Sequence, residues 1–290
     1  MYYQRIIEDS KSLSPAIISR LPMALQLAGH AGHLIKKMRR APLLEISKGG
    51  TDFSTAADTA AEELIIGGIR TRFPEDAILA EESTKASWIA SEYQGKKNAW
   101  VIDPVDGTTV YNRGLENYAV SIGHMSLGEP QFGVVSLPAI SFDDGNLFFG
   151  THWLPAAQCD PVRGTFVEIS VSLPRPYHQC VFGTSFGYSP ENKSRTLMYL
   201  ARLNCMNFRT CLARGSVVEG LIRVAMGELD AYFEPAIKPW DIAAAGLIVH
   251  RAGGIVTRMD GSPWSPFYPD ILAASNPALH QAMVELLNNK

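Results

Sequence analysis

The segment 100–109, with the sequence WVIDPVDGTT, constrains this chain more than any other stretch. An apolar run delivers two carboxylates, Asp103 and Asp106, and then breaks into a Gly-Thr turn. This pattern predicts a strand end that presents hard oxygen ligands for a divalent cation. If Gly107 and Thr108 open a helix, its backbone N–H groups and dipole point toward an anion. A metal site and a phosphate site would then lie side by side at this strand end.

Two further acidic segments make a lone turn a poor explanation. Glu81 and Glu82 follow the apolar run 78–80, and Asp241 follows Pro-Trp at the start of a long apolar segment. Carboxylates placed against apolar residues that should be buried need a counter-charge. A shared cluster of cations would satisfy all of these acidic residues.

The order of these motifs resembles that of the inositol monophosphatase family. The matching motifs are KGGTD at 48–52, TAAD at 55–58, Glu81-Glu82, DPVDGT at 103–108, Trp240-Asp241 and Gly253-Gly254. The resemblance covers about residues 48 to 254. It identifies a superfamily of Mg²⁺-dependent, lithium-sensitive phosphatases that act on several phosphate esters, and it does not identify the substrate.

The predicted elements alternate between helix and strand. Periodicity predicts helices over 14–40 and 54–72 and strands over 77–81, 99–103, 118–125 and 131–136. Beyond these come strands over 166–171, 180–184, 206–211, 229–233 and 271–274, with helices over 190–203, 216–226, 240–252 and 277–288. The alternation indicates an α/β fold. The resemblance implies a layered αβαβα sandwich of alternating helices and mixed sheets.

At 290 residues the chain can form one large domain or two closely joined halves. The Pro- and Gly-containing stretch 143–164 is the best candidate boundary, although its residues 147–149 are strand-like. We expect an N-terminal half, 1–150, that carries most metal ligands. A C-terminal half, 151–290, would complete the active site and the substrate pocket.

Carboxylate ligands without histidine or cysteine nearby suit Mg²⁺, with Mn²⁺ as an alternative. The resemblance puts Glu81, Asp103 and the backbone carbonyl of Val105 on one ion. Asp103 would bridge to a second ion held by Asp106 and Asp241, with two to three ions per site. Two cations roughly 3.5 to 4 Å apart can stabilise the attacking and leaving oxygens of an in-line displacement.

Water is the expected nucleophile, because the acidic motifs contain no serine, cysteine or histidine in a nucleophile motif and the sequence holds no C-x5-R motif. The resemblance implies that Thr108 and Asp58 orient a water near Glu81, and it places Glu82 beside them as a third catalytic candidate. Activation of the water by a metal alone explains the same residues, so both mechanisms stay open.

Each acidic motif also has a structural explanation. Asp241 could cap the helix that it starts, Glu81-Glu82 could be a solvated turn, and Asp103 with Asp106 could form a turn between strand and helix. Their joint occurrence, in this order and at this spacing, favours ligands over these alternatives.

The resemblance places Gly107 and Thr108 at the phosphate and Gly215, Ser216, Val217 and Glu234 around the leaving group. An acidic residue at such a position would accept hydrogen bonds from substrate hydroxyls. Alternatively, Glu234 could simply end a strand at the surface.

Two segments depart from the family pattern near the expected pocket. Val110-Tyr111 stands where Asn-Phe is common, and Arg214 precedes Gly215 where an apolar residue is more usual. Inositol phosphate itself should therefore not be assumed as the substrate.

We expect Mg²⁺-dependent hydrolysis of a small phosphomonoester, an inositol monophosphate or a sugar phosphate, by metal-activated water. The alternatives within the superfamily are a 3'(2'),5'-bisphosphate nucleotidase and a fructose-1,6-bisphosphatase. A different class is a non-catalytic protein that binds a phosphate ligand.

The net charge of −3 and the pI near 6.2 give no basic face for nucleic acid. No apolar run approaches 18 residues, and acidic residues interrupt the first ten residues where a signal peptide would be apolar. The four cysteines show no C-x-x-C spacing, which favours reduced thiols. We therefore expect a cytoplasmic protein without a membrane partner, and the resemblance implies a homodimer.

Overall fold

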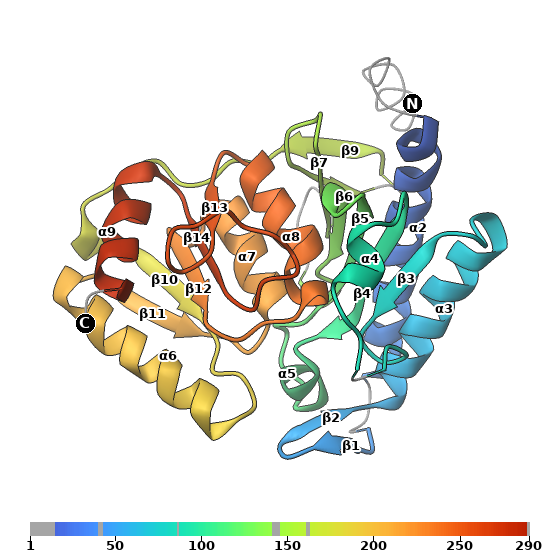
Figure 1. The fold of residues 1–290 in the computed structure, drawn as a ribbon, viewed down its shortest axis with the longest axis horizontal. Helices are drawn as coiled ribbons and strands as arrows, with labels where there is room; N and C mark the ends of the chain where they lie inside the picture. Colours follow the sequence, from blue (N-terminus) through green and yellow to red (C-terminus); the bar gives the residue numbers. More distant parts are fainter. Residues whose placement is uncertain (1–14, 40–42, 86, 141–145, 161–162, 289–290) are drawn as a thin grey trace.

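The computed structural model describes residues 15–39, 43–85, 87–140, 146–160 and 163–288 (Figure 1). The first ten residues, the predicted end of the first helix at residue 40 and parts of the predicted boundary lie outside this description. The helices are α2 (Pro15–Met38), α3 (Ala56–Arg72), α4 (Ser91–Gln94), α5 (Thr108–Asn112), α6 (Pro190–Leu203), α7 (Val217–Ala225), α8 (Pro239–Arg251) and α9 (Pro277–Asn288). Short 3₁₀ helices are η1 (Tyr177–Gln179) and η2 (Asn204–Met206).

A seven-stranded mixed sheet has the order β3-β4-β5-β6-β7-β8-β9. Its strands are β3 (Ala77–Ala80), β4 (Ala99–Asp106), β5 (Ala119–Ser126), β6 (Glu129–Ser136), β7 (Leu147–Thr151), β8 (Ala157–Asp160) and β9 (Thr165–Glu168). Strands β3 and β4 are parallel, and the other neighbours are antiparallel. Strand β4, which carries the Asp-Pro-Val-Asp motif, is buried along its whole length.

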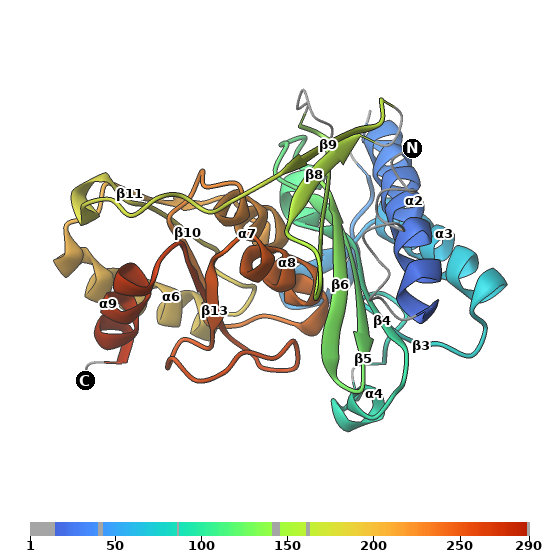
Figure 2. The ribbon, with the colours of Figure 1, turned by 90° about the horizontal axis from the view of Figure 1, so that it is seen from above.

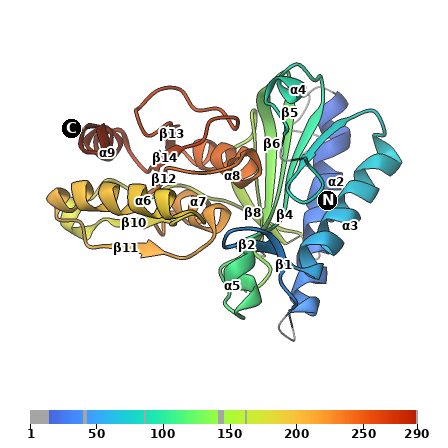
Figure 3. The same ribbon diagram turned by 60° about the horizontal axis from the view of Figure 1, so that its bottom comes forward.

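A five-stranded mixed sheet has the order β11-β10-β12-β14-β13. Its strands are β10 (Val181–Thr184), β11 (Thr210–Ala213), β12 (Ala231–Glu234), β13 (Ile255–Thr257) and β14 (Ile271–Ala274). A separate antiparallel hairpin is formed by β1 (Ile46–Gly49) and β2 (Asp52–Ser54). Figure 3 shows this hairpin beside α5, where the two parts of the molecule meet.

The elements form five layers. Helices α2 and α3 cover one face of the large sheet, α7 and α8 lie between the two sheets, and α6 and α9 cover the far side of the small sheet (Figures 1 and 2). This arrangement confirms the predicted αβαβα sandwich with mixed sheets. Among the described helices, none is both long and apolar enough to cross a membrane.

Helix α8 lies unusually close to the large sheet. A Cβ atom at Gly133 of β6 would lie 2.5 Å from the Ala244 backbone, and one at Gly123 of β5 would lie 3.0 Å from Ala243 Cβ. The hydroxyl of Ser121 also donates to the Trp240 carbonyl, at 3.2 Å. These contacts fix the start of α8 against the large sheet, next to the end of β4.

Several predicted elements differ from the observed ones. The prediction of a strand over 206–211 is wrong at its start, because η2 occupies 204–206 and β11 begins at Thr210. The strand predicted over 166–171 is β9, which ends at Glu168. Strands β1, β2, β8 and β13 were not expected, since none exceeds four residues and β1 is exposed throughout. The large sheet continues to Glu168.

Candidate active site

A local irregularity in β4 brings two aspartates together. Residues three apart on a regular strand face opposite sides of the sheet. The pairing of β4 with β5 shifts between Asp103 and Asp106, which lie opposite Ser121 and Ala119. An extra residue of this kind re-aims a side chain and is common beside functional sites. Both carboxylates can therefore reach one cluster.

Asp241 of α8 completes this cluster. Carboxylate oxygens of Asp103, Asp106 and Asp241 lie within 4.8 Å of one another. Burial, followed by the charges of neighbouring carboxylates, raises the pKa of Asp103 and Asp241 well above the usual range. Burial likewise raises the pKa of Asp106 to about 6. Three crowded carboxylates that resist ionisation form an all-oxygen donor set that fits a hard divalent cation.

The last two members of the cluster are held by the C-terminal half. Asp106 accepts hydrogen bonds from the Ser216 hydroxyl and from the Val218 N–H, the latter at 2.9 Å. Asp241 Oδ2 accepts the Lys238 N–H at 2.7 Å. Asp241 therefore does help to cap α8, as the structural alternative supposed, while it also faces the other two aspartates. A carboxylate has two oxygens and can do both.

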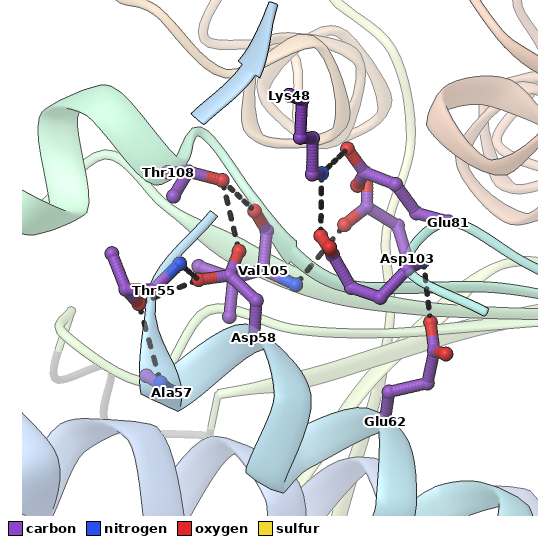
Figure 4. Close-up of polar contacts among 10 residues, drawn as sticks. Lys48, Thr55, Ala57, Asp58, Glu62, Glu81, Asp103, Val105 and Thr108 are labelled. Carbon is purple, nitrogen blue, oxygen red and sulfur yellow. Dashed lines mark hydrogen bonds and ion pairs between the residues drawn. The ribbon is translucent and has the colours of Figure 1, made fainter. Parts of the chain in front are cut away.

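Glu81 and Glu82 follow β3, and Glu81 lies beside Asp103 of the aspartate cluster (Figure 4). Lys48 Nζ of the β1–β2 hairpin lies 2.9 Å from Glu81 Oε1 and 2.6 Å from Glu82 Oε1. Burial raises the pKa of Glu81 to about 7 even though the Lys48 charge opposes the shift. The Glu82 N–H donates to Glu62 Oε2 at 2.8 Å, which fixes the backbone of this pair against α3.

Asp58 and Thr108 are in direct contact. The Thr108 hydroxyl lies 3.0 Å from Asp58 Oδ1 and 3.1 Å from the Val105 carbonyl oxygen. Asp58 Oδ2 accepts the N–H and the hydroxyl of Thr55, at 2.8 and 2.6 Å, so it also caps α3 (Figure 4). Burial raises the pKa of Asp58 despite these hydrogen bonds. The Val105 carbonyl keeps a second lone pair that a cation could use.

Gly107 cannot be replaced easily at the turn between β4 and α5. Its φ is +86°, and a Cβ atom there would lie 2.9 Å from the Asn117 carbonyl oxygen and 3.1 Å from Ser216 Cβ. The left-handed backbone and the close approach both require glycine. The turn then delivers Thr108 at the start of α5, as the helix-opening hypothesis supposed.

Of the residues expected around the leaving group, Gly215, Ser216 and Val217 lie at the start of α7, and Glu234 lies at the end of β12. Gly215, with φ +84°, turns the chain into α7, and Ser216 caps that helix by accepting the Glu219 N–H at 3.0 Å. The Ser216 hydroxyl also donates to Asp106. Val217 is buried in the hydrophobic core between the two sheets. The structure thus places Ser216 against the aspartate cluster.

Glu234 ends β12 but does not lie at the surface, so the strand-end alternative is wrong: its side chain is completely buried. Glu234 Oε2 accepts the N–H of Ser185 at 2.8 Å and the Ser185 hydroxyl at 2.6 Å. Burial raises the pKa of Glu234 to about 8. A buried carboxyl near the aspartate cluster, whose charge acts on Asp241, suits recognition of a polar ligand.

Sequence reasoning gave no role to Lys48, Glu62 or Ser185. The motif at 48–52 was recognised, and its lysine was the available signal. Arg214, the departure before Gly215, forms an ion pair with the buried Glu219 at 3.1 Å, so its charge is satisfied within α7 and its preceding loop.

Comparison with known proteins gives a consistent result. The model of the family described as "Inositol monophosphatase family" matches residues 19–290. The chain is 31% identical to Phosphatase IMPL1, chloroplastic, of Arabidopsis thaliana over 98% of its own length and 73% of that protein. It is 34% identical to the Nus factor SuhB of Escherichia coli K12, over 91% and 94% of the two chains.

A solved structure of inositol monophosphatase from Anabaena superimposes on the chain with a TM-score of 0.75. The two proteins are 30% identical, and the match covers 94% of this chain and 96% of the other.

Proposed function

The chain belongs to the inositol monophosphatase family, and on that premise we propose that it is a Mg²⁺-dependent phosphatase of a small phosphomonoester. The observation that carries this proposal is the aspartate cluster, in which carboxylate oxygens of three residues from β4 and α8 lie within 4.8 Å. We infer the metal ligands Glu81, Asp103, Asp106, Asp241 and the Val105 carbonyl, holding two to three ions. Divalent cations bound there would supply Lewis-acid stabilisation of phosphoryl oxygens and would lower the pKa of an attacking water.

The protein's own residues would orient the nucleophile. The Thr108 hydroxyl can donate its one proton to Asp58 or to the Val105 carbonyl. When it donates to Asp58, its oxygen lone pairs are free to accept a proton from a water beside Glu81. Asp58, whose pKa is raised by burial, is the next acceptor for that proton. Glu82, whose backbone N–H donates to Glu62, would keep the acidic residues after β3 in position.

Inositol or sugar monophosphates are the first candidate substrates. The support is Glu234, a buried carboxyl that faces the C-terminal side of the site and can bind substrate hydroxyls. A 3'(2'),5'-bisphosphate nucleotide and fructose 1,6-bisphosphate are the alternatives within the superfamily. Phosphate release from a panel of these esters at one Mg²⁺ concentration would rank them.

A non-catalytic role is the second candidate, because the Escherichia coli relative bears the name Nus factor. In that case the site would bind a phosphorylated ligand without turnover. Phosphate release that requires Mg²⁺ and stops in excess chelator would support the enzyme. No release from any ester in the panel, together with binding of one of them, would support the binding protein.

We also propose a cytoplasmic homodimer that does not bind nucleic acid. The net charge of −3 supports the last point. The Arabidopsis relative is named as chloroplastic, so the compartment has to be measured. Light scattering would distinguish a dimer from the 31.7 kDa monomer.

A further inference from the structure

Strand β12 aims two polar side chains at the candidate site. Successive residues of a strand face opposite sides of the sheet, so Tyr232 and Glu234 share one face, about 7 Å apart along the strand. Both side chains are buried, Tyr232 at 1% exposure and Glu234 at 0%. On the neighbouring parallel strand β10, Gly183 lies opposite Tyr232, and Ser185 follows two residues later. The pair therefore lies at the carboxyl end of β12.

The ring of Tyr232 is held by two glycines. A Cβ atom at Gly220 of α7 would lie 2.4 Å from Cε2 of this ring, and one at Gly183 would lie 2.7 Å from its Cδ2. Any larger residue at either position would displace the ring. The chain therefore clamps Tyr232 between β10 and α7, which fixes where its hydroxyl lies.

Two buried oxygen atoms of this pair have no hydrogen-bond partner. Neither the Tyr232 hydroxyl nor Glu234 Oε1 forms a hydrogen bond of regular geometry with a described residue, although the Ser185 side chain lies close to the phenol and the Ala236 backbone lies close to the carboxyl. A buried polar group without a partner destabilises the folded protein. Burial and then the charges of Glu234 and Asp106 raise the pKa of Tyr232, so the phenol is neutral and faces the acidic side of the site. Native structures pair nearly all buried polar atoms, so these two oxygens need a partner that the protein chain does not supply.

We propose that the Tyr232 hydroxyl and Glu234 Oε1 together bind one hydroxyl of the substrate's leaving group, which makes Tyr232 a specificity-determining residue. An alcohol both donates and accepts, so it can accept from Tyr232 and complete the hydrogen bonding of Glu234 at the same time. The ligand is a phosphomonoester of a polyhydroxylated alcohol. This inference rests on the proposed phosphatase function and narrows its substrate class.

The test uses Tyr232→Phe in the full-length protein with Mg²⁺ and two esters: myo-inositol 1-phosphate, which carries hydroxyls, and p-nitrophenyl phosphate, which carries none. The variant should raise KM for the inositol ester about 5- to 30-fold with little change in kcat, because the contact exists before and during reaction. For the aryl ester, kcat/KM should change less than about twofold. The unfolding temperature should stay equal or rise, since the hydroxyl has no partner in the free protein.

The matched control is Tyr118→Phe, which removes another buried tyrosine hydroxyl that makes no hydrogen bond of regular geometry and has Arg39 nearby. It should leave the ratio between the two esters unchanged. A hydroxyl held by a buried water for structural reasons would instead lower the unfolding temperature and affect both esters equally in Tyr232→Phe. That result would overturn the inference while leaving the phosphatase function intact.

If the wild-type protein releases phosphate from neither ester, the proposed function fails and calorimetric binding of myo-inositol 1-phosphate decides the inference. Tyr232→Phe should then weaken binding by the same 5- to 30-fold factor. No binding, or equal affinity in both proteins, would refute it.

Discussion

Lys48 Nζ lies 2.9 Å from Glu81 Oε1, so a lysine of the small hairpin contacts a candidate metal ligand of the large sheet. The tip of the same hairpin reaches the other half of the molecule, because the Thr51 hydroxyl donates to the Tyr188 carbonyl at 2.8 Å. The hairpin is thus tied to both sides of the site. The positive charge of Lys48 partly offsets the repulsion among the carboxylates of the site.

Lys48→Met should lower the free energy of unfolding of the metal-free protein by about 1 to 2 kcal/mol at pH 8. The reason is that Glu81 and Glu82 lose their counter-charge. At pH 5 the loss should be much smaller, because Glu81, whose pKa is about 7, is protonated there. Urea unfolding in chelator at both pH values measures this. Lys97→Met, at an exposed position, is the control, and an equal effect of the two variants would contradict the prediction.

Metal-free protein should lose stability as the pH rises from 5 to 8, and Mg²⁺ should restore it. The folded-state pKa values of Asp106, Glu81 and Glu234, at about 6, 7 and 8, exceed the usual values. Their protonated forms therefore favour folding, fully below pH 4 and decreasingly up to pH 8. A cation replaces the lost protons, so the Mg²⁺-induced rise in unfolding temperature should be larger at pH 8 than at pH 5. A rise independent of pH would place the cation elsewhere.

Asp103→Asn should abolish turnover and leave the fold intact. Residues that merely support metal ligands already contribute about 10- to 100-fold at metal sites, so a bridging ligand should contribute more. The metal-free variant should be as stable as the wild type or more so at pH 8, because one repelling charge is gone. Thermal unfolding with and without Mg²⁺ checks this, since the Mg²⁺-induced shift should shrink. Wild-type turnover in a folded variant would exclude the two-metal mechanism.

The acidic motifs were predictable because their chemistry is local. A carboxylate such as Asp103 within a buried apolar run needs a partner in any fold. The strand ends that present such residues can be recognised from the hydrophobic pattern of the sequence. Asp241 is the instructive case, since the cap and the ligand hypotheses both describe its position. Sequence alone treated the two roles as alternatives, although one carboxylate can serve both.

Contacts between distant segments were not predictable. Lys48 meets Glu81 across 33 residues, and Ser216 meets Asp106 across 110. Neither pairing leaves a periodic signal, because each depends on how the layers stack. The β1–β2 hairpin was missed for a related reason: its strands are short and lack the apolar alternation that indicates a sheet. From the sequence alone, Tyr232 likewise looks like an ordinary core residue, because its neighbours on the adjacent strand are not known.

His124 of β5 is a buried histidine with both ring nitrogens unpartnered within the described part of the chain. Its ring stacks on Phe132 with centroids 5.0 Å apart and meets the edge of Trp100 at 5.2 Å. Burial and then the charge of Arg20 lower the pKa of His124 to about 3, with Asp76 opposing the shift. The folded protein therefore keeps this histidine neutral while the unfolded chain protonates it near pH 6.5.

A depressed folded-state pKa means that stability is full above pH 6.5 and is lost as the pH falls toward 3. Relative to His124→Leu, the wild-type protein should therefore lose about 2 kcal/mol of unfolding free energy between pH 6.5 and 5, at roughly 1.4 kcal/mol per pH unit. Urea unfolding of both proteins at these two pH values measures the difference, and titration of the acidic site cancels because it is common to both. His30→Gln, at an exposed position, should follow the wild type. If the curve for His124→Leu runs parallel to that of the wild type, His124 takes up a proton in the folded state, and its aromatic surroundings do not exclude a charged ring.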